Sequence, residues 1–261
     1  MYSKNNTTIN IYWTRHSLSC SNIATSYALQ LLNCKNNYKD FKKNNLYYGK
    51  YSKDSNITNI GINHINTMTD NLIKNGIQFD KIITSNLIRA IKTADKFAEN
   101  LNIDYIYILP FIQEINTITD GTNVRSINLL KDYLKNTNTN SNIHIFNNHQ
   151  YFMEPSSIYD FINLIYVFFP LKEKKIYNFL VVTHGGFFEK YISGKKVANL
   201  EIWKQKYDLK INNNIVVNKP EKFMNGIGID RKDNYYCNPL NFSVNKQTFE
   251  HTLKECNIKI K

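Results

Sequence analysis

Two histidines and two arginines of this chain follow apolar runs that read as strand ends, and their side chains suit phosphate chemistry. Arg15 and His16 are consecutive, His184 follows a long apolar run, and Arg89 is one of only four arginines in the chain. An arginine presents a planar fork of donors that matches phosphate oxygens. A histidine beside it can be a nucleophile, a phosphate ligand or an acid/base. These residue types indicate a phosphoryl-transfer site in which cations fixed in the protein, and no metal, stabilise the developing charge.

A carboxylate, Glu114, follows another predicted strand, where it could move a proton. Taken singly, each of these residues has a commonplace explanation. An Arg–His pair can lie on a surface, a histidine after a buried strand can belong to the core, and a helical arginine often packs only its stem. Their occurrence at successive strand ends favours one shared site.

The elements that must position these residues alternate along the chain. Strands are predicted at 9–13, 81–84, 105–109, 177–183 and 211–217, and helices at 19–32, 58–75, 87–100, 123–134, 157–169 and 187–192. This alternation is typical of an α/β fold with three layers, a largely parallel central sheet and helices on both faces. Ligands of such sheets bind beyond the carboxyl ends of the strands, which is where the candidate residues fall.

The chain is expected to form a single domain over residues 1–261. Segments 33–55 and 121–156 are expected to be variable inserts, and residues from about 219 form a C-terminal extension with strand pieces near 234–236 and 241–244. The Asn-, Thr- and Ser-rich stretch 136–148 is predicted to be a mobile loop.

Composition excludes some classes of protein. The chain has 261 residues, 42% of them hydrophobic and 13% aromatic, which excludes overall disorder. The net charge is 33 − 21 = +12, carried almost entirely by lysine. A solvated lysine-rich surface is favoured over a dedicated nucleic-acid face, so nucleic acid is not the expected partner, although it stays open as an alternative.

The cysteines and the N-terminus predict the compartment. Four cysteines without a CxxC pair argue against a zinc site and against a disulfide framework. The first ten residues are polar and lack the apolar core of a signal peptide, and the longest apolar stretch, 164–171, is too short for a membrane helix. The expectation is a cytoplasmic protein without a membrane segment.

Three motifs carry a family resemblance. Segment 14–22, Thr-Arg-His-Ser-Leu-Ser-Cys-Ser-Asn, resembles the signature Arg-His-Gly-x-Ser/Thr-x-x-Asn of the histidine phosphatase superfamily, in its phosphoglycerate mutase-like branch (branch 1). Segment 84–94 is similar to that branch's Ser-Pro-Leu-x-Arg-Ala-x-x-Thr-Ala, and 181–187 to its second-histidine motif. Segments 57–61 and 211–216 resemble its Leu-Thr-x-x-Gly and its late Asn-x-x-Val strand.

The resemblance implies a phosphoglycerate mutase-like fold, no cofactor, and a role for each matched residue. His16 would be the nucleophile that forms a phosphohistidine, and it must be neutral to attack. Arg15, Arg89 and a protonated His184 would surround the phosphate oxygens. The remaining implied roles are those of Asn22, which would line the phosphate pocket, and of Glu114, which would be general acid and then general base.

Some positions depart from the family pattern. Ser17 replaces the usual glycine, where a side chain would crowd the turn or the phosphate pocket, Leu18 replaces an acidic residue and Asn86 replaces proline. No catalytic group is lost. Because the Glu-Arg-His-Tyr-Gly element of phosphoglycerate mutases is absent, the resemblance favours a metal-independent phosphomonoester hydrolase over a mutase-type phosphotransferase. A weak or inactive phosphate-binding module is the other alternative. The expected partner is a phosphorylated small molecule or phosphoprotein, with specificity from the variable inserts, and no oligomeric state is predicted.

Overall fold

The structure of the chain is a computed structural model. It describes residues 7–31, 54–114, 134, 142–145, 158–169, 171, 176–195, 197–209, 215–227 and 246–258.

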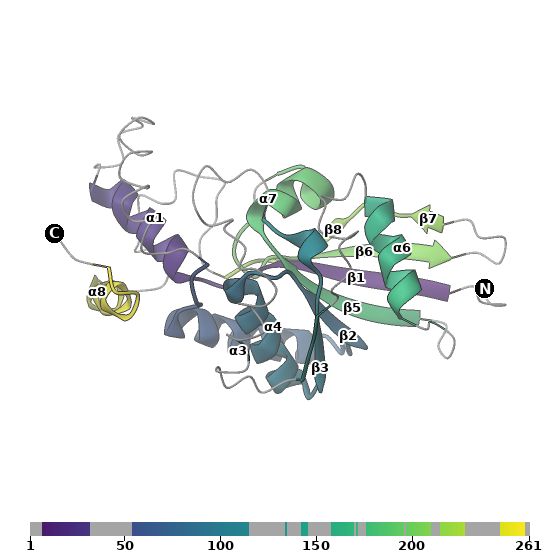
Figure 1. Cartoon of the computed structure of the whole chain (residues 1–261), viewed down its shortest axis with the longest axis horizontal. Coiled ribbons are helices and arrows are strands. Elements are labelled where there is room, and N and C mark those ends of the chain that lie inside the picture. The colour runs from purple at the N-terminus through teal and green to yellow at the C-terminus, as the bar shows by residue number, and fades with distance from the viewer. Residues whose placement is uncertain are drawn as a thin grey trace.

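An eight-stranded mixed sheet forms the centre of the molecule (Figure 1). Its order is β4-β3-β2-β5-β1-β6-β7, with β8 paired to β6. The strands are β1 (Thr7–Arg15), β2 (Lys81–Thr84), β3 (Tyr105–Ile108), β4 (Asn142–Ile145), β5 (Ile176–Thr183), β6 (Ile202–Leu209), β7 (Ile215–Val217) and β8 (Glu221–Met224). The five strands from β4 to β1 run parallel, whereas β6, β7 and β8 join antiparallel. The predicted α/β class with a largely parallel sheet is confirmed.

Helices cover both faces of this sheet (Figure 1). The helical segments are α1 (Cys20–Leu31), α3 (Asn59–Lys74), α4 (Ile88–Leu101), the 3-10 turn η1 (Pro110–Ile112), α6 (Ile158–Phe168), α7 (Gly185–Phe187), the π-helical η4 (Phe188–Ser193) and α8 (Lys246–Glu255). Apolar residues of α3 and α4 pack on one face, and those of α6, α7 and η4 pack on the other.

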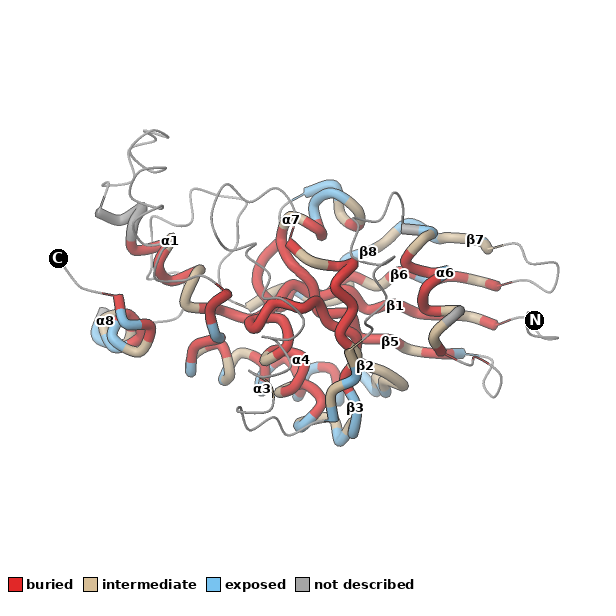
Figure 2. Tube along the Cα trace, in the orientation of Figure 1, coloured by how far each residue is buried: buried red, intermediate tan, exposed pale blue. Residues whose placement is uncertain are grey.

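The alternation of side chains along the central strands explains these two layers. In β1, Ile9, Ile11 and Trp13 belong to the cluster under α6, whereas Tyr12 belongs to the cluster under α3 and α4. Successive residues of a strand point to opposite faces, so a strand buried on both faces must be apolar throughout. β5 repeats the pattern with Phe179-Leu180-Val181-Val182. Figure 2 shows these central strands buried along most of their length.

A third, smaller cluster lies beside the sheet, where α8 packs on α1 (Figure 1). The two helices are joined by a disulfide between Cys20 and Cys256, which are 236 residues apart in the sequence. The sequence argued only against a disulfide framework, and it did not predict this single bond. Sequence spacing could not reveal it, because only the fold brings the C-terminal segment next to α1.

Other expectations need correction at the sheet edges. Residues 142–145 of the predicted mobile loop form β4, and the predicted strand at 211–217 is reduced among described residues to β7. The sequence reading missed β6, β8 and α8. The predicted helix 123–134, apart from residue 134, the strand pieces 234–236 and 241–244, and most of the inserts 33–55 and 121–156 lie outside the described residues.

No helix in the described part of the chain is long and apolar enough to cross a membrane.

Candidate active site

His16 begins the loop that follows β1, at the carboxyl end of the parallel strands. Its backbone N–H donates to the carbonyl of Thr183 at 2.9 Å, which extends the β1–β5 pairing by one residue. Because β1 and β5 are both buried, this bond fixes the histidine backbone on the rigid centre of the fold.

The hydrogen bonds of the His16 ring assign its tautomer. Nδ1 lies 2.7 Å from the carbonyl oxygen of Ser17, which can only accept, so Nδ1 carries the proton. Nε2 then has the free lone pair and accepts from Nε of Arg89 at 3.0 Å. Burial, followed by the positive charges of Arg89, His184 and Arg15, holds the pKa of His16 well below its usual value, although the Ser17 carbonyl opposes this shift. His16 is therefore neutral near pH 7, with its lone pair on Nε2.

Two buried guanidinium groups approach this ring from different elements. Arg89 stands in the first turn of α4, and Arg15 is the last residue of β1, where its Nη1 donates to the carbonyl of Val197 at 3.1 Å. Both arginines are at most 3% exposed. Two guanidiniums beside a neutral imidazole make this end of the sheet suited to an anionic ligand, because their planar forks of donors match the oxygens of phosphate or carboxylate.

His184 and Glu114 lie at the same end of the sheet as His16 and Arg89. The ring centroids of His184 and His16 are 5.2 Å apart, and His184 Nε2 is 2.5 Å from the hydroxyl of Ser85. Glu114 Oε1 accepts from the backbone N–H of Gly186 at 2.7 Å, and its Oε2 is 3.8 Å from Nη2 of Arg89. Glu114 is buried, so it is not a solvated loop carboxylate. The structure thus brings the carboxylate next to both the second-histidine motif and Arg89.

Asn22 shapes the loop after His16. Its side-chain oxygen accepts from the backbone N–H and the hydroxyl of Ser19, at 3.1 and 3.0 Å. It also receives a longer bond of 3.4 Å from the amide of Asn199. The Asn22 oxygen therefore holds the loop after His16, and the role of Asn22 in lining the phosphate pocket stays a prediction.

Asn199 is a site residue that the sequence reading missed. Its Nδ2 donates to the carbonyl of His16 at 2.7 Å, and the next residue, Leu200, donates its N–H to the carbonyl of Arg15 at 3.1 Å. The family resemblance matches its late Asn-x-x-Val element to 211–216 and not to this segment. Asn199 lies three residues before Ile202, the first residue of β6, which is the spacing of an Asn-x-x-Val element. This spacing was the sequence signal that could have identified Asn199.

A buried carboxylate holds the segment that contains Asn199. Glu201 accepts from the indole of Trp203 at 2.9 Å, from the backbone N–H of Ala198 at 3.1 Å, and from Lys222 at 3.1 Å. Burial raises the pKa of Glu201, but these three donors outweigh it and the pKa is lowered overall. The carboxylate is therefore charged near pH 7 and pins the segment to β6 and β8.

Segment 54–58 caps three helices around the site. Asp54 Oδ1 accepts from the N–H of Ile88 at 2.6 Å, at the start of α4 one residue before Arg89. The hydroxyl of Ser55 caps α1 at 3.0 Å, and that of Thr58 caps α3 at 3.0 Å. Such caps satisfy the first N–H groups of a helix, which have no partner within it. The start of α3 agrees with the helix predicted over 58–75, whereas nothing in the sequence indicated the bonds made by Asp54 and Ser55.

Ser17, the main departure from the family signature, is turned toward α3. Its hydroxyl donates to the carbonyl of Gly61 at 2.8 Å, and its backbone N–H donates to the hydroxyl of Thr93 at 3.0 Å. A Cβ on Gly61 would lie 2.4 Å from the carbonyl oxygen of Leu18, so the glycine lets α3 approach the loop closely. The Ser17 side chain occupies this contact and does not point at the His16 ring.

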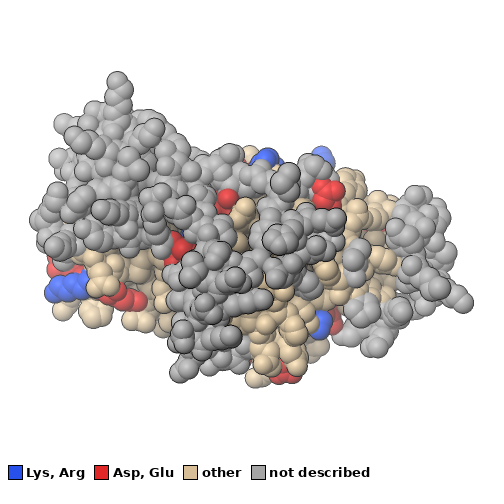
Figure 3. Space-filling view, in the orientation of Figure 1, with Lys and Arg blue, Asp and Glu red and all other residues tan. Residues whose placement is uncertain are grey.

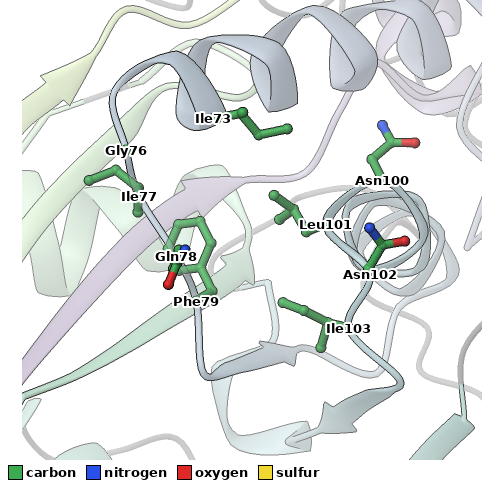
Figure 4. Close-up of a pocket in the computed structure, with 9 residues that line it drawn as sticks. All are labelled: Ile73, Gly76, Ile77, Gln78, Phe79, Asn100, Leu101, Asn102 and Ile103. Atoms are coloured by element: carbon green, nitrogen blue, oxygen red, sulfur yellow. The ribbon is translucent and has the colours of Figure 1, made fainter.

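Other surfaces of the described residues offer less chemistry. A cavity of about 440 Å³ opens at the opposite end of the sheet, between the last residues of α3 and α4 (Figure 4). Apolar side chains and amides line it, and none of its lining residues is titratable. On the face drawn in Figure 3, the described lysines and arginines are scattered, with acidic residues among them. Within the described ranges, no group of His, Cys, Asp and Glu is arranged to hold a metal ion.

Comparisons with known proteins agree with the motifs. The family model of the histidine phosphatase superfamily (branch 1) matches residues 41–133, which confirms the resemblance over that range; it contains segments 57–61 and 84–94, and the segments around His16 and His184 lie outside it. No curated protein matches the sequence significantly.

Solved structures similar to this chain include Mycobacterial hydrolase 2, at 12% identity and a TM-score of 0.49, with 95% of this chain and 97% of that chain covered. An ecdysone phosphate phosphatase from Bombix mori has 15% identity and a TM-score of 0.46, covering 83% and 95%. A phosphoserine phosphatase from Entamoeba histolytica has 17% identity and a TM-score of 0.40, covering 83% and 98%.

Proposed function

We propose that this chain, which carries the sequence signature of the histidine phosphatase superfamily (branch 1), is a phosphomonoester hydrolase that works through a phosphohistidine on His16. The observation that supports this most strongly is the ring of His16. Its proton is on Nδ1, and its free Nε2 lone pair faces the guanidinium of Arg89 at 3.0 Å. A neutral imidazole surrounded by buried cations is a nucleophile placed where an anionic substrate would be held.

The first step would transfer the phosphoryl group to the enzyme. On substrate binding, the Arg89 guanidinium turns from Nε2 to the phosphate oxygens, which frees the lone pair. Nε2 attacks phosphorus, the bond from phosphorus to the ester oxygen breaks, and protonated Glu114 gives its proton to the leaving oxygen. The Nδ1–H of His16 keeps its bond to Ser17 and stabilises the positive charge that the phosphorylated ring acquires.

The second step would return the enzyme to its starting state. Glu114, now a carboxylate, takes a proton from a water molecule, and the oxygen of that water attacks the phosphorus. The bond between Nε2 and phosphorus breaks, phosphate leaves, and His16 is again neutral while Glu114 is protonated. Arg15, Arg89 and His184 would hold the equatorial oxygens in both steps, and each such group contributes roughly a hundredfold to a thousandfold to the rate.

Hydrolysis is favoured over a mutase reaction because the sequence lacks the Glu-Arg-His-Tyr-Gly element. The inactive-module alternative rested on Ser17 and on the other departures from the family motifs. The hydroxyl of Ser17 is bonded to Gly61 and is not directed at the His16 ring. The substrate class stays a phosphorylated small molecule or phosphoprotein, with turnover independent of metal. The cytoplasmic location stays a prediction, and the Cys20–Cys256 disulfide counts against it because disulfides persist mainly in oxidising compartments.

A hydrolysis panel of aryl, sugar, amino-acid and peptide phosphomonoesters tests the proposal. The wild type should hydrolyse at least one of them, equally well with and without a chelator, and vanadate should block the reaction. His16→Ala should lower kcat by at least about a thousandfold, since it removes the nucleophile. His144→Ala, which removes an exposed histidine on β4, is the matched control and should act like wild type. Equal rates for His16→Ala and wild type would refute the mechanism, and vanadate binding without any turnover would favour the phosphate-binding module.

A further inference from the structure

The C-terminal helix α8 packs against α1 and against the loop that follows His16. Phe249, Leu253 and Cys256 of this segment pack against Leu18 and Ile23, which belong to the loop after His16 and to α1. Figure 1 shows α8 next to α1, to one side of the sheet and of the helices that cover it. The segment therefore contacts the site loop directly without sharing the main cores.

Two specific bonds join the end of α8 to the starts of two helices. Cys256 forms the disulfide with Cys20, the first residue of α1. Glu255 Oε1 accepts from the backbone N–H of Asn59, the first residue of α3, at 2.9 Å. A carboxylate is favourable at a helix N-terminus because the free N–H groups there carry partial positive charge.

The starts of α1 and α3 hold the loop that carries His16. Thr58, immediately before α3, donates its N–H and hydroxyl to the carbonyl of Leu18, at 3.0 and 3.2 Å. Cys20 donates its N–H to the carbonyl of Asn56 at 3.0 Å, and Ser19 forms an isolated bridge with Ile57. The disulfide thus ties α8 to the point where the loop and segment 54–58 are clamped together.

From this arrangement we propose that α8 is a redox-controlled latch: the Cys20–Cys256 disulfide keeps the loop of His16 in its active geometry, and its reduction releases α8 and lowers activity. The proposal rests on the proposed function for its effect on rate. α8 has only ten helical residues, and helices of this length are marginal alone, so its small apolar contact depends on the covalent link.

Reduction by a dithiol gives a balanced reaction. Cys20 is partly exposed and Cys256 is buried, so the thiolate of the dithiol attacks Sγ of Cys20. The S–S bond breaks, Cys256 leaves as a thiolate and takes up a proton. The second thiol of the reductant then attacks the mixed disulfide, releases the Cys20 thiol, and leaves the reductant as a cyclic disulfide. Two electrons pass from the dithiol to the protein.

The test compares the full chain before reduction, after dithiothreitol and after re-oxidation. Alkylation and peptide mapping should find Cys20 and Cys256 protected until reduction. Reduction should lower kcat/KM for the best substrate of the panel at least tenfold and reversibly. Amide exchange in residues 16–22 and 54–61 should become at least tenfold faster, while exchange in β5 stays the same.

A pair of variants identifies the sulfur that responds. Cys256→Ser should be slow and insensitive to dithiothreitol, whereas Cys237→Ser should behave like the parent. Equal rates and equal exchange in the two redox states would overturn the proposal. So would labelling of Cys20 and Cys256 without reductant, or the loss of redox sensitivity in Cys237→Ser alone. If the chain hydrolyses nothing, the exchange comparison still decides the latch, so failure of the two proposals can be told apart.

Discussion

Replacement of Ser17 by alanine or glycine separates two explanations of this residue. In family members with glycine at this position no side chain is present, so Ser17 could obstruct the phosphate pocket. In the structure the Ser17 hydroxyl donates to the carbonyl of Gly61 at 2.8 Å, and Ser17 is not one of the described residues that have a positive φ. The backbone here therefore does not require glycine, and we expect both variants to lose stability and keep their activity.

The expected loss of unfolding free energy follows from the contacts of the Ser17 hydroxyl. Gly61 lies in the first turn of α3, where the helix supplies its carbonyl with another donor, so removal of the serine hydroxyl leaves no orphan acceptor. Ser17→Ala should then lower the free energy of unfolding by about 1 kcal/mol, the usual net worth of one hydrogen bond. Ser17→Gly should lose about 0.4–1 kcal/mol more, because glycine is freer in the unfolded chain.

Urea denaturation and hydrolysis kinetics on the same preparations provide the assay. The kcat/KM of both variants should stay within about threefold of wild type. Thr67→Ala is the control: its hydroxyl bonds within α3 on an exposed face, and its loss should change stability by less than about 0.5 kcal/mol. If Ser17→Gly is at least tenfold faster than wild type without losing stability, the hydroxyl does obstruct the pocket and the orientation described here is wrong.

Three further changes have defined outcomes. Gly61→Ala places a Cβ 2.4 Å from the Leu18 carbonyl oxygen, so it should displace the loop after His16. We expect a free energy of unfolding lower by about 1–3 kcal/mol in urea denaturation, and a lower kcat. An unchanged kcat would show that activity tolerates the displaced loop. Asp54→Asn weakens the cap on the N–H of Ile88. It should lower the free energy of unfolding by about 1 kcal/mol and raise KM for a phosphomonoester, because the cap lies next to Arg89. A change in stability without a change in KM would mean that the cap does not position Arg89. The pKa of His16 is lower in the folded than in the unfolded chain, so the free energy of unfolding should fall as pH drops below about 6.5, by at most about 1.4 kcal/mol per pH unit. His16→Gln, measured in urea at each pH, should lack this contribution to the pH dependence. If wild type and His16→Gln show the same dependence of stability on pH, the ring is not buried and neutral.

The layers of the fold and the gathering of Arg15, Arg89 and His184 around His16 could be predicted from the sequence because their signals are local. Continuous apolar runs indicated β1 and β5, and strand ends place side chains at one edge of a parallel sheet by topology. Arg15, Arg89 and His184 were placed near His16 on this basis alone.

Interactions between distant segments could not be predicted in the same way. Asn199 contacts His16 across 183 residues, and the caps of Asp54 and Ser55 lie in a polar stretch that reads as a loop. β6 was missed because Lys, Gln and Asp interrupt its apolar positions, which is the pattern of a strand with one more exposed face. The disulfide has no local signal at all, since no spacing relates Cys20 to Cys256.

Rapid-quench analysis of the enzyme during turnover of a ³²P-labelled phosphomonoester tests the central claim most directly. The account predicts a transient phosphoenzyme that is labile to acid and stable to base, that maps to His16, and that is absent in His16→Ala. A protein that turns over substrate with no such species, or with the label on another residue, would contradict it.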